Sequence, residues 1–218
     1  MSQLVVDHIE KEYSTPCGTI QALRQCSFQL DSSESLAIVG PSGSGKSTLL
    51  SILGTLEPPS KGTVLLDEIN ITSLSSSETI FFRRKHLGII FQDHFLLPQC
   101  SALENVLVSL LAERRITKQD QERAELLLER VGLKDRFHHR PGELSGGECQ
   151  RVSIARSIFR NPKLLLADEP TGSLDRSNAD SIAQLLFELT QTEKMIFVLA
   201  THDPTVAQLS TKIFPLVV

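Results

Sequence analysis

Apolar and polar residues alternate along two stretches near the amino terminus, residues 4–9 and 22–30. A period of two is typical of strands that bury one face, so both stretches predict strands of an antiparallel sheet. A short apolar run at 35–39 leads directly into a glycine-rich turn, and residues 46–54 follow with the spacing of a helix. Two more short strands are predicted at 63–66 and 87–91.

The pattern changes beyond Phe91, where apolar residues recur at helical spacing and Gly132 and the Pro141-Gly142 pair interrupt it. The predictions for this part are helices at 102–114, 118–131 and 147–160, a strand at 163–167, a helix at 176–190 and a strand at 195–200. Strands that alternate with helices usually form a parallel sheet covered on both faces, so we expect an α/β fold.

We expect a single domain over residues 1–218. Its core would be formed by residues 1–91 and 161–218, and the helical block 92–160 would be inserted into it.

Composition narrows the function without identifying it. The net charge of −4 gives no basic field that would favour nucleic acid as a partner. Residues 1–10 lack a secretory signal pattern, and the longest apolar stretches, 195–200 and 213–218, are far shorter than a bilayer span. A role at a membrane would therefore require a partner rather than direct insertion.

The four cysteines show no CxxC pairing and no accompanying histidine cluster. They are Cys17, Cys26, Cys100 and Cys149. This spacing favours reduced, buried or incidental thiols of a cytoplasmic protein over a zinc site or a disulfide framework.

The turn after residue 39 matches the phosphate-loop pattern G-x-x-x-x-G-K-[ST], with an apolar strand before it and a helix after it. Its residues are Gly40, Pro41, Ser42, Gly43, Ser44, Gly45, Lys46 and Ser47. Glycines allow several backbone N–H groups to point at one anion, and the helix start adds further unsatisfied donors. Lys46 would supply a charge for the β- and γ-phosphates, and the Ser47 hydroxyl could ligate Mg²⁺. The chain has no Asn-Lys-x-Asp stretch, which disfavours GTP.

A second candidate feature is the apolar run 164–167, which ends in Asp168 and Glu169. In a doubly wound sheet the carboxyl ends of the strands open onto the ligand crevice, so these carboxylates should face the phosphate loop. Asp168 would hold Mg²⁺, and Glu169 would orient and activate the attacking water.

A third feature is a second glycine-rich helix start, with Ser145 able to cap a helix that begins near Gly147. One nucleotide cannot easily be served by two such helix starts within one small domain. A head-to-tail pair of chains solves this, because the phosphate loop of one copy would face the helix start of the other, with ATP between them. A simple capped helix is the alternative for this segment alone.

Taken together, these features resemble the nucleotide-binding subunits of ABC transporters over essentially the full length of the chain. They occur in the family's order: residues 40–47, Phe91-Gln92, Leu144-Ser145-Gly146-Gly147-Glu148, Asp168-Glu169, Ser173-Leu174-Asp175 and Thr201-His202-Asp203. The resemblance implies a RecA-like parallel sheet core with an antiparallel β subdomain and an inserted α-helical subdomain. It also implies ATP and Mg²⁺ as cofactors and a homodimer in the ATP-bound state.

The resemblance implies roles for single residues as well. Gln92 looks like a contact of Mg²⁺ or of the hydrolytic water, and His202 like the switch residue at the γ-phosphate. With Glu169 and Lys46, these two would make up the catalytic set. Tyr13, the one tyrosine of the chain, stands where the family places an aromatic that stacks on adenine; ordinary packing is the alternative.

The remaining implied contacts involve nucleotide binding. Thr48 follows the phosphate loop and would contact the nucleotide of its own chain. Ser145 and Gly147 would touch the γ-phosphate bound to the opposite copy, and Asp175 looks like a contact across the dimer.

Segments 83–106 and 168–175 resemble one branch in particular, which contains the lipoprotein-releasing, macrolide-efflux and cell-division type ATPases. The lipoprotein-releasing type looks closest. This implies a peripheral position on the cytoplasmic side of the bacterial inner membrane and an integral membrane transporter subunit as partner. The surface near 92–98 would receive that partner's coupling helix.

Two other functions stay open. A non-transport ABC ATPase of DNA repair or translation is disfavoured, because the chain has neither a long coiled-coil insertion nor a second cassette. The other is a non-enzymatic role in which ATP-driven dimerisation recruits partners.

The chain departs from the family pattern at three sites: Ser33 where a turn glycine is usual, Asp67-Glu68 where Asp-Gly is common, and Cys149 beside the second helix start. We expect the 67–68 turn to change type.

Overall fold

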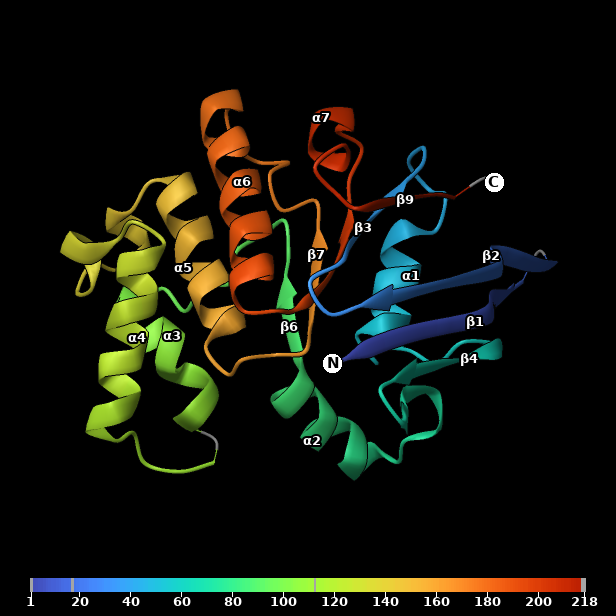
Figure 1. The fold of residues 1–218 in the computed structure, drawn as a ribbon, viewed down its shortest axis with the longest axis horizontal. Helices are drawn as coiled ribbons and strands as arrows, with labels where there is room; N and C mark the ends of the chain where they lie inside the picture. Colours follow the sequence, from blue (N-terminus) through green and yellow to red (C-terminus); the bar gives the residue numbers. More distant parts are fainter. Residues whose placement is uncertain (1, 17, 112, 217–218) are drawn as a thin grey trace.

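The computed structural model describes residues 2–16, 18–111 and 113–216. Cys17 lies outside the described residues. A parallel sheet of five strands in the order β6-β7-β8-β3-β9 runs through the middle of the molecule (Figure 1). Its strands are β3 (Ser35–Val39), β6 (Leu87–Ile90), β7 (Leu164–Asp168), β8 (Ile196–Ala200) and β9 (Lys212–Pro215).

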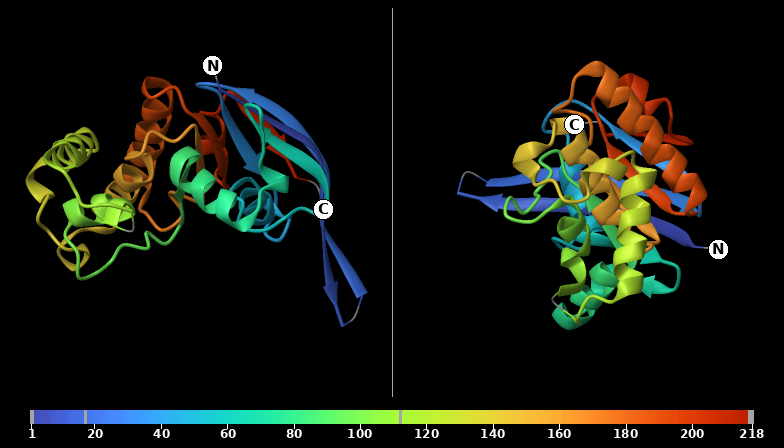
Figure 2. Two further views of the ribbon diagram at one scale, coloured as in Figure 1. Left: turned by 90° about the horizontal axis from the view of Figure 1, so that it is seen from below. Right: turned by 90° about the vertical axis from the view of Figure 1, so that its left-hand side faces the viewer.

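A second, antiparallel sheet has the order β2-β1-β4-β5 and lies beside the first. Its strands are β1 (Gln3–Thr15), β2 (Gly18–Asp31), β4 (Lys61–Leu66) and β5 (Ile69–Asn70). The far ends of β1 and β2 project beyond the rest of the molecule (Figure 2). Together with the parallel sheet, this confirms the predicted fold class.

Helices cover both faces of the parallel sheet. They are α1 (Lys46–Leu53), α2 (Ser76–His86), α3 (Ala102–Leu111), α4 (Lys118–Arg130), α5 (Gly146–Ile158), α6 (Arg176–Thr192) and the short α7 (Pro204–Ala207). Single 3₁₀ turns occur at Ile71–Ser73, Lys134–Arg136 and Pro141–Glu143. None of the described helices has both the length and the apolar character that crossing a membrane requires.

Strand β7 shows how one sheet serves two cores. Leu165 and Ala167 belong to the core formed with α3 to α6, whereas Leu164 and Leu166 face α1 and the antiparallel sheet. All four side chains are buried, so the strand is continuously apolar, as expected for a parallel strand covered on both faces. This double burial fixes the place where the strand ends, at Asp168.

Four of the described helices and strands are absent from the sequence-based predictions: α2, the two-residue strand β5, the short helix α7 and β9. Helix α2 has mostly polar residues, and its start is marked instead by a capping box between Ser75 and Glu78. Strand β9 is a short edge strand whose residues are largely exposed, so it lacks a clear apolar pattern. The strands β1 and β2 are also longer than predicted, because β-bulges with positive φ at His8 and Gln25 interrupt their alternation.

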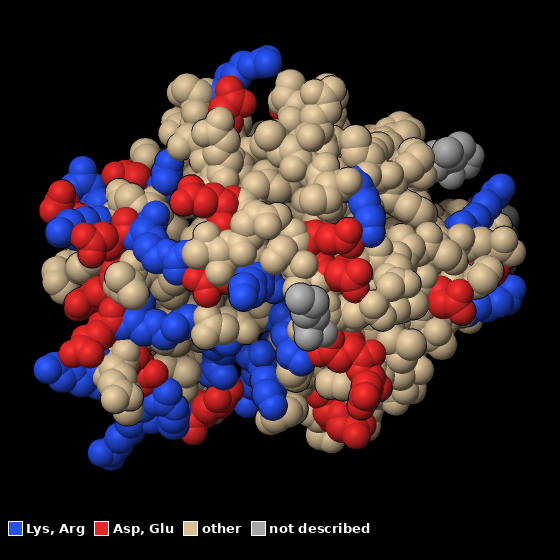
Figure 3. All heavy atoms as spheres, in the orientation of Figure 1, with Lys and Arg blue, Asp and Glu red and all other residues tan. Residues whose placement is uncertain are grey.

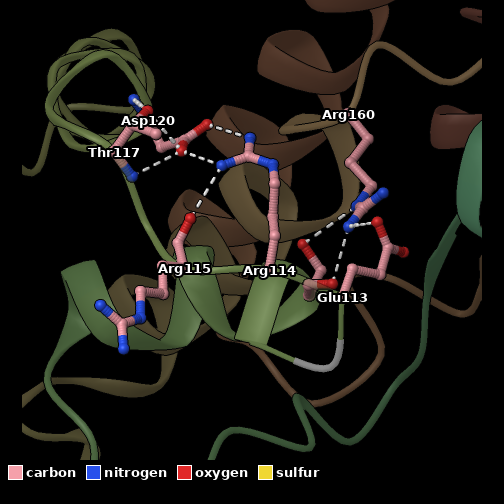
Figure 4. A network of polar contacts seen from close by, with 7 residues as sticks. Glu113, Arg114, Arg115, Thr117, Asp120 and Arg160 are labelled. Atoms are coloured by element: carbon pink, nitrogen blue, oxygen red, sulfur yellow. Dashed lines mark hydrogen bonds and ion pairs between the residues drawn. The ribbon is translucent and has the colours of Figure 1, made fainter.

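Ion pairs connect the residues that follow α3 to α4 and to the residues that follow α5 (Figure 4). Arg114 Nη1 lies 2.6 Å from Asp120 Oδ2, and Arg160 Nη2 lies 3.0 Å from Glu113 Oε2. The hydrogen bonds from Arg114, and next those from Thr117, lower the pKa of Asp120. These contacts fix the helices of the block to one another. Over the same block, acidic and basic side chains are interspersed on the surface (Figure 3).

The two turns that lack the usual glycine both adopt left-handed backbone. Ser33 has φ 69° and Asp67 has φ 55°, while Glu68 is not in that region. A type I′ turn needs positive φ at both central residues, so the Asp67-Glu68 turn has the sign pattern of type II′. The predicted change of turn type is therefore confirmed.

We expect Ser33→Gly to stabilise the protein by about 0.5–1 kcal/mol, because a left-handed conformation is strained for a residue with a Cβ. The native backbone contact of this residue, N–H to Met195 O at 2.9 Å, is kept by glycine. Urea unfolding of the two proteins measures the difference. An unchanged or lower unfolding free energy would contradict the idea that this turn is strained.

Candidate nucleotide-binding site

The phosphate loop joins β3 to α1 in a conformation that its glycines make possible. Gly43 has φ 80° and Gly45 has φ 96°, both in the left-handed region. A Cβ at Gly45 would lie 2.4 Å from Ala22 O, so a side chain has no room there. At Gly43 the added atom would meet nothing within 4 Å, so this position requires glycine for its backbone alone.

Lys46, the first residue of α1, turns its side chain back over the loop. Its Nζ donates to Gly40 O at 2.9 Å and to Pro41 O at 3.0 Å. These carbonyls hold the ammonium beside the helix start, where unsatisfied N–H groups favour an anion. The arrangement fits a phosphate group, and the predicted binding loop is built as an anion cradle.

A cavity of about 620 Å³ opens beside the loop. The lining contains many of the residues that the sequence analysis assigned to the site: Ser42, Gly43, Gly45, Lys46, Ser47, Thr48, Gln92, Asp168, Glu169 and His202. It also contains four residues that were not assigned to the site: Ala22, Phe91, Asp93 and Phe95. The carboxyl ends of β3, β6, β7 and β8 therefore converge on one space, as expected for this kind of sheet.

Glu169 and His202 are in direct contact within this cavity. His202 Nδ1 lies 2.9 Å from Glu169 Oε1. The Glu169 side chain is only 17% exposed, whereas that of His202 is 73% exposed. Glu169 has φ 46°, and its N–H donates to Ala200 O at 3.0 Å, so the backbone of β8 holds it in this strained conformation.

Gln92 reaches the cavity from the loop that follows β6. A Cβ added to Gly172 would lie 3.4 Å from Gln92 Nε2, so the amide packs against the segment that follows Glu169. Ser47 and Asp168 line the same cavity and, with the Gln92 amide, offer the oxygen ligands that Mg²⁺ prefers.

Tyr13 is not among the described residues that line the cavity. Its hydroxyl donates to Glu57 Oε2 at 2.8 Å, and Lys11 Nζ lies 5.1 Å from the ring centroid. Both ordinary packing and adenine stacking are compatible with a ring that is 38% exposed. The stacking role stays a prediction.

The second glycine-rich helix start forms a capping box at the beginning of α5. Ser145 Oγ accepts from Glu148 N at 3.2 Å, and Glu148 Oε2 accepts from Ser145 N at 2.8 Å. Asp175 caps α6 in a similar way, and hydrogen bonds from Asn178 and then Ser177 lower its pKa to about 2. Gly147 packs against Asn178, whose Oδ1 would lie 3.1 Å from an added Cβ.

Neither Ser145, Gly147 nor Asp175 is among the described residues that line the cavity of the same chain. The molecule thus carries two separate glycine-rich helix starts, one beside the cavity and one outside its lining. This separation is what the arrangement of two head-to-tail chains requires.

Cys149 follows the capping box and is 8% exposed. Its Sγ lies 3.6 Å from Pro141 O, and burial raises the pKa of the thiol. The thiolate form is therefore disfavoured in the single chain.

Comparison with known proteins places the chain in a family. The family model described as ABC transporter matches residues 23–172. The lipoprotein-releasing system ATP-binding protein LolD of Shewanella sp. (strain MR-7) is 48% identical over 204 residues, 94% of this chain and 88% of the relative. The lipoprotein-releasing system ATP-binding protein LolD 1 of Rhodopirellula baltica is 44% identical over 214 residues, which are 98% of this chain and 93% of the relative.

Solved structures agree with the sequence relatives. The dimeric structure of MJ0796, a bacterial ABC transporter cassette, has a TM-score of 0.87, 38% identity, and coverage of 98% of this chain and 94% of its own. A dimeric post-hydrolysis state of the same cassette, bound to ADP and Pi, also has a TM-score of 0.87, at 37% identity, with the same coverage. The predicted resemblance is therefore confirmed, and the chain belongs to the ABC transporter family as one of its ATP-hydrolysing cassettes.

Proposed function

We propose that this ATPase powers a lipoprotein-releasing transporter whose membrane-spanning part is carried on another chain. The observation that carries the proposal is the cavity in which the phosphate loop, Glu169 and His202 meet. The lipoprotein-releasing relatives of 43–48% identity support the transported class. The cassette would then work at the cytoplasmic face of the inner membrane, held there by its partner.

In this proposal the N–H groups at the start of α1 and the Lys46 ammonium bind the β- and γ-phosphates. Ser47, Asp168 and Gln92 would hold Mg²⁺, which would neutralise charge on the phosphates when bound. The side chains of Lys46, Ser47, Asp168 and Gln92 all line one cavity, and the oxygen atoms of the last three are ligands of the kind that Mg²⁺ prefers.

Glu169 accepts a proton from the attacking water and aligns it with the γ-phosphate. His202, in contact with Glu169 at 2.9 Å, is exposed enough to reach the same phosphate. Glu169 combines a strained backbone conformation with a side chain that lines the cavity, a combination often found at functional sites.

Two copies close head to tail on two ATP molecules. Ser145 and Gly147 of each copy complete the site of the other, and loss of the γ-phosphate removes their contacts and opens the dimer. The dimeric MJ0796 structures support this assembly. Phe95 is 64% exposed and Leu97 is 36% exposed, which supports the surface at 92–98 as the place where the membrane partner docks.

Purification of the chain from membranes, with its partner identified by mass spectrometry, tests the function. We expect an integral membrane partner whose presence stimulates ATP turnover in vesicles and releases a bound lipoprotein. A partner of the macrolide-efflux or cell-division type would overturn the substrate class but not the ATPase. Turnover that no membrane partner alters would overturn the transport role.

Dimer formation gives a sharper prediction for Ser145. In a Glu169→Gln background with ATP, we expect Ser145→Ala to weaken dimerisation about 10²-fold, because each dimer loses two contacts of roughly 1.5 kcal/mol to a charged phosphate. Analytical ultracentrifugation over a range of protein concentrations measures this.

Ser75→Ala is the matched control, since Ser75 forms the same capping box with Glu78 on α2, outside the cavity lining. Each substitution should cost about 1 kcal/mol of stability through the lost cap. Only the Ser145 variant should lose dimers. Equal dimerisation of the two variants would disprove the contact with the partner's nucleotide.

A further inference from the structure

A side chain of helix α5 donates hydrogen bonds to backbone carbonyls of the loop that carries Gln92. The Arg156 guanidinium donates from Nη2 to His94 O and from Nη1 to Phe95 O, both at 2.7 Å. Burial lowers the pKa of Arg156, yet both bonds are charge-assisted, so they fix the path of the loop directly after Gln92.

A second residue of α5, Gln150, bridges this loop to the acidic strand end. Its side chain is fully buried. Its Nε2 donates to Pro170 O at 2.8 Å, and its Oε1 lies 2.5 Å from His94 Nδ1. Because Nε2 is the donor to a carbonyl, Oε1 is the acceptor, and His94 Nδ1 carries the proton that it donates.

The two ends of this bridge adjoin the two residues that would handle the attacking water. Pro170 directly follows Glu169, and His94 is separated from Gln92 only by Asp93. One planar amide therefore sets the spacing between the two loops. A buried amide with both groups satisfied is rigid, whereas a side chain that left either partner unpaired would be costly.

We propose that Gln150 is a positioning residue for ATP hydrolysis, holding the Gln92 loop and the Glu169 loop at a fixed separation through its bonds to His94 and Pro170. Since Ser145 caps the start of α5, the same helix links both loops to the proposed contact with the partner's nucleotide. The inference rests on the proposed hydrolytic roles of Glu169 and Gln92.

Removing the bridge should slow the chemical step and spare nucleotide binding. We expect Gln150→Leu and His94→Phe each to lower kcat about 30-fold, with KM for ATP changed less than about twofold, since small misplacements near the chemistry can cost up to about 10²-fold. The double variant should be no slower than the worse single variant, because the two residues form one unit.

The pH dependence of kcat in Gln150→Glu distinguishes the positioning role from a role in packing alone. Burial and the Pro170 carbonyl raise the pKa of a carboxyl at position 150, whereas a protonated His94 would lower it. Only the protonated carboxyl can donate to the Pro170 carbonyl as the amide does. The ratio of variant to wild-type kcat should therefore be close to one at low pH and fall as pH rises. A ratio that stays close to one from pH 6 to pH 9, with fully folded protein, would overturn the proposal.

Ser153→Ala is the control for packing of the same helix. Ser153 is 1% exposed, and its Oγ has no hydrogen-bond partner among the described residues, so its loss should leave kcat and thermal unfolding near wild type. If Gln150→Leu does not fold, the half-buried His94→Phe still decides the matter.

The assay includes wild type and Glu169→Gln. Wild type without turnover would refute the proposed function itself. Active wild type, slow Glu169→Gln and a Gln150→Leu kcat equal to that of Ser153→Ala would refute only the positioning role. A kcat that falls together with a raised KM, or additive single effects, would refute it as well.

Discussion

Glu169→Gln should abolish nearly all ATP turnover and leave ATP binding unchanged, with kcat lowered about 10³-fold through loss of the general base. The amide keeps the size and the Oε1 position of the carboxylate, so the contact with His202 Nδ1, 2.9 Å in the native protein, can persist. What is lost is the ability to accept a proton from water. The rate at which phosphate forms in quenched single-turnover reactions separates this effect from product release.

Asp93→Asn is the matched control for Glu169→Gln, because it removes one negative charge from the lining of the same cavity. We expect its kcat to stay within about threefold of wild type, because Asp93 has no role in proton transfer in the proposed mechanism. Similar losses in both variants would mean that cavity charge, not a specific base, governs the rate. Undiminished turnover of Glu169→Gln would remove Glu169 from the catalytic step.

The fold was predictable where burial imposes a simple pattern. Strands β3, β7 and β8 contain unbroken apolar runs at 36–39, 164–167 and 196–200, because helices or a second sheet cover both faces of the sheet. Such runs are typical of a parallel sheet. Helix α2 and strand β9 were not predictable in this way. One is a polar helix defined by its cap, and the other is an exposed edge strand, so neither carries a strong apolar period.

The candidate site was predictable where its residues form a contiguous sequence motif. The phosphate loop and the Asp168-Glu169 pair each follow a strand whose end is fixed by burial, so their convergence follows from topology. The bridge through Gln150 could not be predicted, because its partners come from positions 94 and 170 and meet only in three dimensions. The contact of Tyr13 with Glu57 depends on packing between β1 and a distant loop for the same reason.

Lys46→Met should weaken ATP binding about 10³-fold, close to 4 kcal/mol, because two charge-assisted bonds to phosphate oxygens are worth roughly 1.5–3 kcal/mol each. Methionine keeps the apolar stem and removes only the ammonium. The native bonds of that ammonium to Gly40 O and Pro41 O are lost too, but solvent can replace them at this open loop. Stability should therefore change by only about 1 kcal/mol.

Titration calorimetry with ATP, ADP and AMP at one fixed ionic strength decides whether Lys46 acts on the β- and γ-phosphates. A point charge at those phosphates matters in proportion to how many of them the ligand carries, so the loss should be large for ATP, smaller for ADP and slight for AMP. The salt dependence of ATP binding should also become shallower in Lys46→Met, since one favourable charge interaction is gone. Equal losses for all three nucleotides would instead mean that the substitution collapses the loop built by Gly43 and Gly45, and that the Lys46 ammonium supports the cradle rather than the phosphates.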